Sequence, residues 1–324
     1  MRRFPSSAAA LVAALILALA SSTAHADYKQ AVMYYMQQRY DKAIQELKPD
    51  LDANPDWEFG HRLVGLCYLN LHNNALAISS LTRAVQLKST AFATYLGLGQ
   101  AYFNMQRYDN ALEALNQADQ YLAKEKEPEK ESYKLHRLRG STYYRLEKFN
   151  EAANELAAAI RLSQSEWTDF SQLGVAYYNL NRYDEAIQAL QKALTLKPGQ
   201  NFIMEYLGKC YFKEGAADLG AKQYDQALDH FRRAKDYNPR DGYIYYNMAE
   251  AYLFQKNYPE AEKALNQALE LMPRSAEVFQ RLGLVYEKQK KWDLSLSAYQ
   301  KADELNPSPG LKEAISRVTE LKKR

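Results

Sequence analysis

Cysteine, glycine and proline are scarce in this sequence. Its 324 residues include 2 Cys, 13 Gly and 10 Pro. Two cysteines cannot build the disulfide framework that stabilises many small secreted domains. The low Gly and Pro content argues against a low-complexity or disordered chain. The fold must therefore depend on burying apolar side chains, and hydrophobic residues make up 47% of the sequence.

The sequence also lacks a strong net charge and the short motifs typical of enzymes. The formal charge is +3, with Lys and Arg alternating with Asp and Glu along the chain. A nucleic-acid-binding protein needs a concentrated basic face, so we expect no nucleic-acid partner. There is no glycine-rich phosphate loop, nucleophile elbow, paired-His zinc motif or Cys-x-x-Cys. We therefore expect no catalytic activity, no cofactor and no metal site.

The one long hydrophobic run lies at the N-terminus. Arg2 and Arg3 precede an apolar stretch from Ala8 to Ala20, and Ala24 and Ala26 supply small residues after it. The stretch is too short to span a bilayer, so residues 1–26 are predicted to be a secretory signal peptide, with an uncleaved anchor as the alternative. No Cys lies near this site, so we expect no lipoprotein anchor. The mature chain should be secreted or periplasmic, without a transmembrane segment.

An internal repeat dominates the rest of the chain. The pattern is Gly-x-x-Tyr, followed nine residues after the Tyr by Ala, and Ala sometimes replaces the Gly. Complete copies are Gly65, Tyr68 and Ala77; Gly99, Tyr102 and Ala111; Gly140, Tyr143 and Ala152; and Gly174, Tyr177 and Ala186. In the sixth unit, Gly208 and Tyr211 reach Ala227 only across a longer gap. The final Ala or Ser falls at positions 43, 77, 111, 152, 186, 227, 261 and 295, which gives eight units.

The period of 34 residues resembles that of the tetratricopeptide repeat. Gly or Ala on one helix and Ala on its partner allow two helices to approach closely, and large residues between them fill the contact. The resemblance implies an all-α, right-handed superhelical solenoid of about eight helix-turn-helix units over residues 27–307. Such hairpins bury their apolar faces against both neighbours. Together with the signal peptide, it suggests an exported bacterial member of the family.

Two irregularities and a terminal helix complete the domain plan. Two spacings of 41 residues indicate seven-residue insertions, near 119–133 and near 213–222. Seven residues are close to two helical turns and roughly preserve the packing face. The first insertion is predicted to be a solvated helix extension and loop, or alternatively a docking element. Residues 308–324 are predicted to form a capping helix with Leu311, Ala314 and Val318 on one face.

The repeat register also assigns the tyrosines and cysteines. The Tyr residues of the pattern share their register with the small packing residues, so we expect them in the core. Cys67 and Cys210 both immediately precede such a Tyr. Four repeats separate them, which makes a disulfide geometrically implausible. We expect two free, buried and poorly reactive thiols.

In the resembling family, the first helix of each hairpin lines a concave groove that binds protein partners. The candidate groove residues are those outside the packing set: Tyr35, Arg62, Leu69, Gln100, Phe103, Asn104, Arg137, Tyr144, Tyr178 and Asn179. Their mixture of aromatic, apolar and polar groups suits an extended peptide or an amphipathic helix. The aromatic positions among them could instead serve packing. We expect a non-catalytic protein- or peptide-binding scaffold or adaptor in the cell envelope. The alternative is an accessory subunit of an envelope enzyme or of a polysaccharide or protein export complex.

Signal-peptide cleavage should leave Asp27 as the first residue of the mature protein. The intact mass of protein purified from the envelope or medium of an expressing bacterium checks this. A product from those fractions that retains residues 1–26 would contradict the prediction.

Overall fold

The structure, a computed structural model, describes residues 28–323. Within that range it contains seventeen α-helices and no β-strand. They form eight successive helical hairpins and one final helix, which confirms the predicted all-α solenoid with a C-terminal cap. The chain divides into two compact units, Met1–Gln172 and Leu173–Arg324, here called unit 1 and unit 2.

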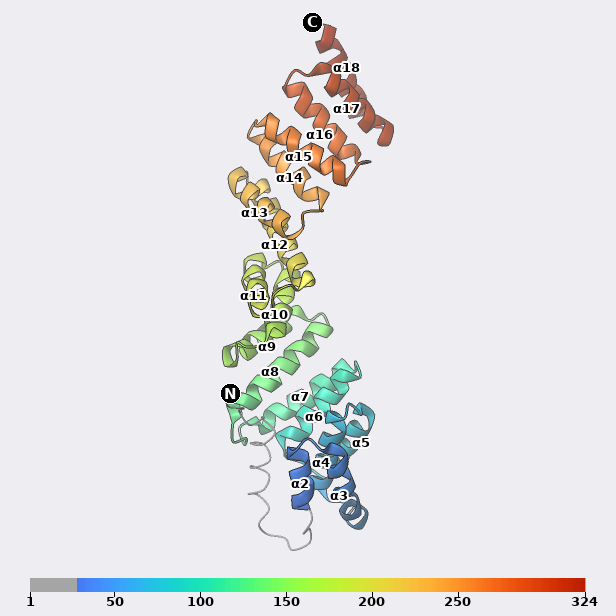
Figure 1. The fold of residues 1–324 in the computed structure, drawn as a ribbon, viewed down its shortest axis with the longest axis vertical. Helices are drawn as coiled ribbons and strands as arrows, with labels where there is room; N and C mark the ends of the chain where they lie inside the picture. The colour runs from blue at the N-terminus through green and yellow to red at the C-terminus, as the bar shows by residue number, and fades with distance from the viewer. Residues whose placement is uncertain (1–27, 324) are drawn as a thin grey trace. The chain divides into compact units, whose positions relative to one another are not determined.

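In unit 1 each hairpin packs against the next, and the helix colours in Figure 1 follow the chain from blue to green. Its helices are α2 (Tyr28–Met36), α3 (Tyr40–Ala53), α4 (Glu58–Asn70), α5 (Asn74–Gln86), α6 (Phe92–Asn104), α7 (Tyr108–Leu122), α8 (Pro128–Arg145) and α9 (Phe149–Leu162). Helix α10 (Trp167–Asn179) begins in unit 1 and ends in unit 2. First helices of successive hairpins also contact one another: α4 contacts α6, and α6 contacts α8.

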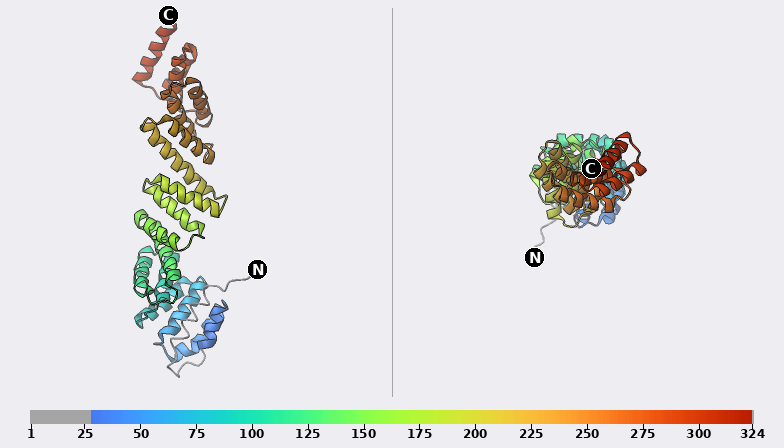
Figure 2. Two further views of the ribbon diagram at one scale, coloured as in Figure 1. Left: turned by 90° about the vertical axis from the view of Figure 1, so that its left-hand side faces the viewer. Right: turned by 90° about the horizontal axis from the view of Figure 1, so that it is seen from above.

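Unit 2 repeats the same arrangement, and Figure 2 shows its hairpins from a second side. Its helices are α11 (Tyr183–Leu196), α12 (Asn201–Gly220), α13 (Tyr224–Tyr237), α14 (Gly242–Phe254), α15 (Tyr258–Leu271), α16 (Ala276–Lys288), α17 (Trp292–Leu305) and α18 (Pro309–Lys323). The final helix α18 buries Leu311, Ala314 and Val318 against Tyr299 and Ala302. It also donates two hydrogen bonds from Arg317 to the Glu287 carboxylate of α16, at 3.0 and 2.9 Å.

The two helices of a hairpin meet at a small residue on the first helix. A Cβ added to Gly99 would lie 2.6 Å from Leu115, and one added to Gly140 would lie 2.8 Å from Leu156. Both leucines are fully buried. Because real Cβ atoms do not approach other heavy atoms so closely, glycine is what allows the leucine of the second helix to fill this contact.

The sixth hairpin differs from the register expected from the sequence. A Cβ on Gly215 would lie 2.7 Å from Phe231, whereas one on Gly208 would meet only ordinary contacts at 3.4 Å. Gly215 therefore occupies the close-contact position, and its distance to Ala227 is that of the other repeats. The extra residues lengthen α12 at its N-terminal end instead of falling near 213–222. Cys210 consequently does not occupy the repeat position of Cys67.

The cysteines themselves behave as predicted. Cys67 and Cys210 are free and completely buried. Burial raises the pKa of each thiol to about 12, so neither is a reactive thiolate at neutral pH.

The prediction that the pattern tyrosines pack in the core is confirmed for Tyr68 and Tyr102, which pack against buried clusters. Tyr211 is buried, but the others are only half-buried. They lie at the hairpin edge, and in several repeats a cation five residues later covers the ring. The Arg107 guanidinium is 4.8 Å from the Tyr102 ring centroid, and that of Arg182 is 4.4 Å from Tyr177. A phenol is amphipathic, which suits such a boundary position.

The turn within each hairpin uses a non-glycine residue in the left-handed conformation. In the third hairpin Gln106 has φ 59°. Its N–H donates to the Phe103 carbonyl, and the Arg107 N–H donates to the Tyr102 carbonyl, both at 2.9 Å. These bonds form a Schellman motif, which normally favours glycine at this position. The equivalent residues are Gln38, His72, Glu147, Asn181, Lys222, Lys256 and Lys290.

Replacing Glu147 or Lys222 with Gly should raise the free energy of unfolding by about 0.5–1 kcal/mol each. Glycine relieves the strain of the left-handed conformation, and this gain exceeds the loss that comes from the greater conformational entropy of glycine in the unfolded chain. Asn181→Gly should gain less, since asparagine tolerates this conformation. Urea denaturation followed by circular dichroism measures the change. Glu113→Gly, on the exposed face of α7, is the control and should destabilise by about 1 kcal/mol. A loss of stability in Glu147→Gly would contradict the interpretation.

Candidate functional site

A groove of about 650 Å³ lies on the first helices of unit 1, and we call it the unit 1 groove. It is lined by Tyr35 of α2; Leu66, Leu69 and Asn70 of α4; Ala93, Leu96, Gly97, Gln100 and Phe103 of α6; Glu131, Tyr133, Lys134, Arg137, Leu138, Ser141 and Arg145 of α8; and Thr168, Asp169 and Gln172 of α10. No second helix contributes, so the groove follows from the stacking of successive hairpins.

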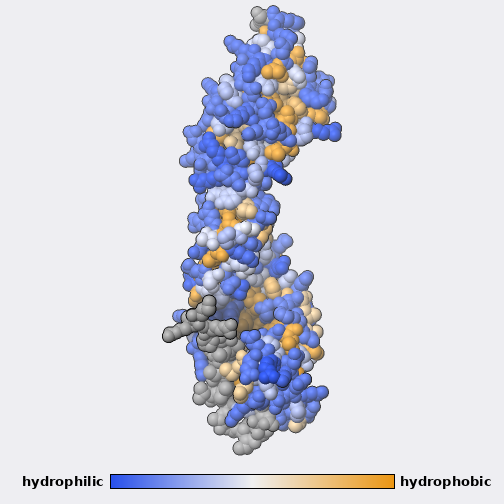
Figure 3. Space-filling model, viewed as in Figure 1, coloured by the Kyte–Doolittle hydropathy of each residue, from blue (hydrophilic) through white to orange (hydrophobic). Residues whose placement is uncertain are grey.

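The floor of the groove is apolar and continuous with the core. Leu96 and Phe103 pack against a buried cluster that contains Leu135 and Leu138. A Cβ on Gly97 would lie 3.0 Å from Leu66, so the missing side chain lets α4 and α6 pack closely here. Figure 3 shows that apolar residues form patches on a largely hydrophilic surface. These half-buried side chains offer apolar area to a ligand.

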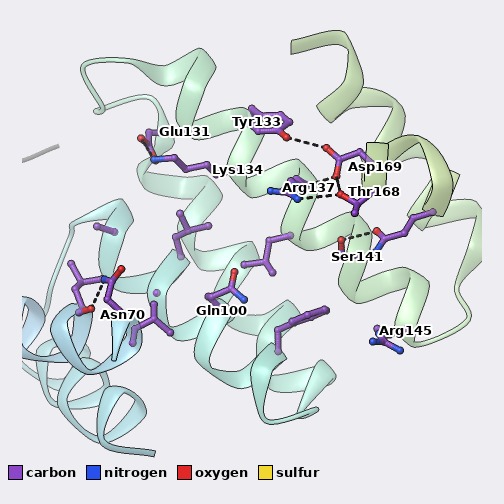
Figure 4. A pocket seen from close by; sticks show the side chains of 18 of the residues that line it. Asn70, Gln100, Glu131, Tyr133, Lys134, Arg137, Ser141, Arg145, Thr168 and Asp169 are labelled. Atoms are coloured by element: carbon purple, nitrogen blue, oxygen red, sulfur yellow. Dashed lines mark hydrogen bonds and ion pairs between the residues drawn. The ribbon is translucent and has the colours of Figure 1, made fainter. Parts of the chain in front are cut away.

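A buried carboxylate joins α8 to α10 at one wall. The Asp169 side chain is 2% exposed. Its Oδ2 accepts a hydrogen bond from the Tyr133 hydroxyl at 3.0 Å, and its Oδ1 accepts one from Arg137 Nε at 2.8 Å. Figure 4 shows the three side chains converging. Burial and the nearby carboxylate raise the pKa of Tyr133 to about 12, so its hydroxyl remains a donor.

Side-chain amides and hydroxyls in the groove bond mainly to the protein itself. Asn70 donates to the Leu66 carbonyl at 2.7 Å, and Ser141 donates to Gln172 at 2.8 Å. Gln100 donates to Asn104 at 2.8 Å, and Asn104 in turn donates to Asn74 at 2.9 Å. These bonds fix the side chains and leave their remaining donors and acceptors for a ligand.

Half of the residues proposed from the sequence line this groove. Tyr35, Leu69, Gln100, Phe103 and Arg137 do so together. Because they come from four helices, only the stacking of the hairpins brings them into one surface.

The other five proposed residues lie elsewhere. Arg62 forms an ion pair with Glu58 at 3.0 Å. Asn104 supports Gln100 from outside the lining. Tyr144 packs its ring edge-on against Phe149. Tyr178 and Asn179 belong to unit 2, where Tyr178 packs against Tyr206 and the Asn179 amide bonds to the Val175 carbonyl.

Of the five charged residues that line the groove, the sequence interpretation proposed only Arg137. Glu131, Lys134, Ser141 and Arg145, together with Leu138, are spaced three or four residues apart and so share one face of α8. The first insertion obscured this stripe, because α8 begins at Pro128, one turn before a helix of the usual length would begin. Asp169 has no sequence signal beyond its residue type.

The described residues hold no cluster of three or more His, Cys, Asp and Glu side chains arranged to bind a metal. Within residues 28–323 no helix has the length and apolar character needed to cross a bilayer.

Family comparisons now identify the repeat. Models described as tetratricopeptide repeat match residues 201–274, 170–200, 1–53 with 246–309, and 92–121, which together make up more than half of the chain. The chain belongs to the tetratricopeptide-repeat family. A search of curated protein sequences found no match.

Several solved structures are similar to this tetratricopeptide-repeat chain. The C-terminal part of a TPR repeat-containing protein from Cytophaga hutchinsonii is 16% identical, with 89% of this chain and 99% of that one covered and a TM-score of 0.47. MamA from Desulfovibrio magneticus RS-1 is 24% identical over 55% of this chain and 97% of its own, with a TM-score of 0.39. The TPR domain of Arabidopsis OM64 is 21% identical over 36% and 96%, with a TM-score of 0.35.

Replacing Asp169 with Ala should lower the free energy of unfolding by about 2 kcal/mol, because Arg137 and Tyr133 lose a charged acceptor shielded from water. Tyr133→Phe should cost about 1 kcal/mol, since it removes one hydrogen bond. Thermal and urea denaturation measure both. Glu166→Ala is the matched control, because that carboxylate is 44% exposed and 3.7 Å from Arg137; its cost should stay below about 0.5 kcal/mol. Equal effects of the Asp169 and Glu166 variants would refute the role given to Asp169.

Proposed function

We propose that this tetratricopeptide-repeat protein is a non-catalytic scaffold that binds a segment of another protein in the unit 1 groove. The observation that carries the proposal is the groove itself, in which an apolar floor from α4, α6 and α8 lies beside fixed polar groups. An extended segment or a helix can bury apolar side chains on such a floor while its polar groups meet the donors and acceptors at the edge.

We also propose that the protein acts in the cell envelope or outside the cell. The support is the N-terminal sequence, with Arg2 and Arg3, the apolar run Ala8–Ala20 and the small residues Ala24 and Ala26. Its partners would then be proteins of the same compartment.

Photo-crosslinking in living cells can find the partner. A benzoyl-phenylalanine placed at Gln100, in the groove, should crosslink to it, whereas the same residue at Glu113, exposed on the second helix α7, should not. Mass spectrometry of the crosslinked peptide identifies the bound segment, which can be synthesised. Equal crosslinking from both positions would place the binding surface outside the groove.

With that segment in hand, Phe103→Ala should weaken binding by about 2 kcal/mol, roughly 30-fold, because an aromatic side chain in a groove is a typical anchor. Tyr144→Ala is the matched control, since Tyr144 has the equivalent position in the next repeat but does not line the groove. Both changes should lower stability, and only Phe103→Ala should lower affinity. Isothermal titration beside thermal melts separates the two. Unchanged affinity in a folded Phe103→Ala variant would contradict the proposal.

A further inference from the structure

Five charged side chains line the unit 1 groove, and two pairs of them largely neutralise each other. Arg137 pairs with Asp169 at 2.8 Å, and Lys134 pairs with Glu131 at 2.7 Å. Arg145 is left over. Among the described residues it makes no hydrogen bond or ion pair.

The pair between Lys134 and Glu131 is incomplete. The Glu131 side chain is 5% exposed, and only its Oε1 accepts the Lys134 ammonium. Its Oε2 is shielded from solvent and has no hydrogen-bond partner. A buried carboxylate oxygen without a donor loses its hydration without compensation. A donor brought by a ligand would supply the missing bond, and a cationic donor would supply the strongest one.

The surroundings of Glu131 favour a positive charge. A second carboxylate, Glu125, lies in the loop between α7 and α8 and is half-buried. Burial and then the neighbouring Glu131 raise the pKa of Glu125, while Arg62 and Lys134 lower it. Arg62 is already paired with Glu58. Two carboxylates thus share mainly the Lys134 charge, and both belong to the first insertion.

Arg145 lies at the other end of the same face of α8. Fourteen residues separate it from Glu131, which corresponds to about 21 Å along the helix axis. Arg145 is exposed, and its guanidinium offers up to five donors, a geometry that suits a carboxylate. The groove therefore has an acidic pole at Glu131 and a basic pole at Arg145, with the apolar floor between them.

We propose that the unit 1 groove selects an extended peptide segment with a basic side chain near one end, bound by Glu131, and an acidic side chain about six residues away, bound by Arg145. The spacing follows from the length of extended chain that spans about 21 Å. This inference rests on the proposed function, since it states the chemistry of the segment that the groove would bind.

Three capped synthetic peptides test the charge pattern without terminal charges. Each is seven residues long with alternating Leu and Ser between its ends, and the end residues are Lys and Glu, Glu and Lys, or Gln and Gln. Fluorescence anisotropy at low salt measures their affinities, because added salt screens exposed charges. One of the two charged orders should bind at least about tenfold more tightly than the Gln peptide. The preferred order also gives the chain direction.

Two variants show which end of the peptide binds at Glu131 and which binds at Arg145. Glu131→Gln should remove the advantage of Lys, about tenfold, because this carboxylate is shielded from water. Arg145→Gln should remove the advantage of Glu by only about threefold, because exposed pairs are weaker. Glu129→Gln and Lys148→Gln are the controls. Each removes one charge of the same sign at an exposed position outside the groove lining, and neither should change peptide affinity. Arg145→Glu should change the preference at that end of the groove from an acidic to a basic side chain. A fourth peptide, with Lys at both ends, should then bind this variant best.

The outcomes separate this inference from the proposed function. If the Gln peptide binds as tightly as both charged peptides and Phe103→Ala weakens all three, the groove binds peptides but the charge assignment is wrong. Equal losses in Glu129→Gln and Glu131→Gln would also overturn it, as a general charge effect. If no peptide binds at concentrations on the order of 1 mM, the charge inference fails. The photo-crosslinking experiment at Gln100 then tests the proposed function separately.

Discussion

The close approach of the two helices within each hairpin is the constraint on which the other features depend. Gly99 and Gly140 let the leucine of the second helix reach the backbone of the first. A hairpin so formed still has apolar faces that it cannot bury alone, and stacking against its neighbours covers them. Stacking in turn lays α4, α6 and α8 next to one another. The groove exists because these first helices are adjacent.

The core and the groove surface use different residues of the same helices. Leu135 of α8 is fully buried in the core cluster, whereas Lys134 and Arg137 face the groove. The Asp169 carboxylate fixes Arg137 and ties the wall of the groove to its neighbour. Under the proposed function, side chains held in this way would lose little freedom on binding a ligand, which would lower the entropic cost of association. The groups that still lack partners would then contribute most to discrimination between ligands.

The two insertions of seven residues had different structural results. Both lengthen the first helix of a hairpin at its N-terminal end, since α8 has 18 residues and α12 has 20 where the usual first helix has 13. In α8 the added turn carries Glu131 into the groove. In α12 the added turns carry buried packing residues such as Ile203 and Leu207. The seven residues added to α12 are close to two helical turns and preserve its packing face, whereas α8 gains five residues, a little more than one turn, and with them a charge that faces the groove.

The sequence by itself determined the hairpins, because the spacing of small and large residues is local and recurs in every repeat. It therefore predicted the all-α solenoid, its capping helix and five of the residues that line the groove. It could not place the seven added residues within the sixth repeat, since Gly208 and Gly215 are equally compatible with a helix and only contact with Phe231 distinguishes them. It assigned Tyr102 to core packing, but it could not show that Arg107 covers the ring of this half-buried residue. The bond between Asp169 and Arg137 joins residues 32 positions apart. Such a contact depends on the geometry of neighbouring hairpins, so only the tertiary structure decided which charges in the groove are paired and which remain available.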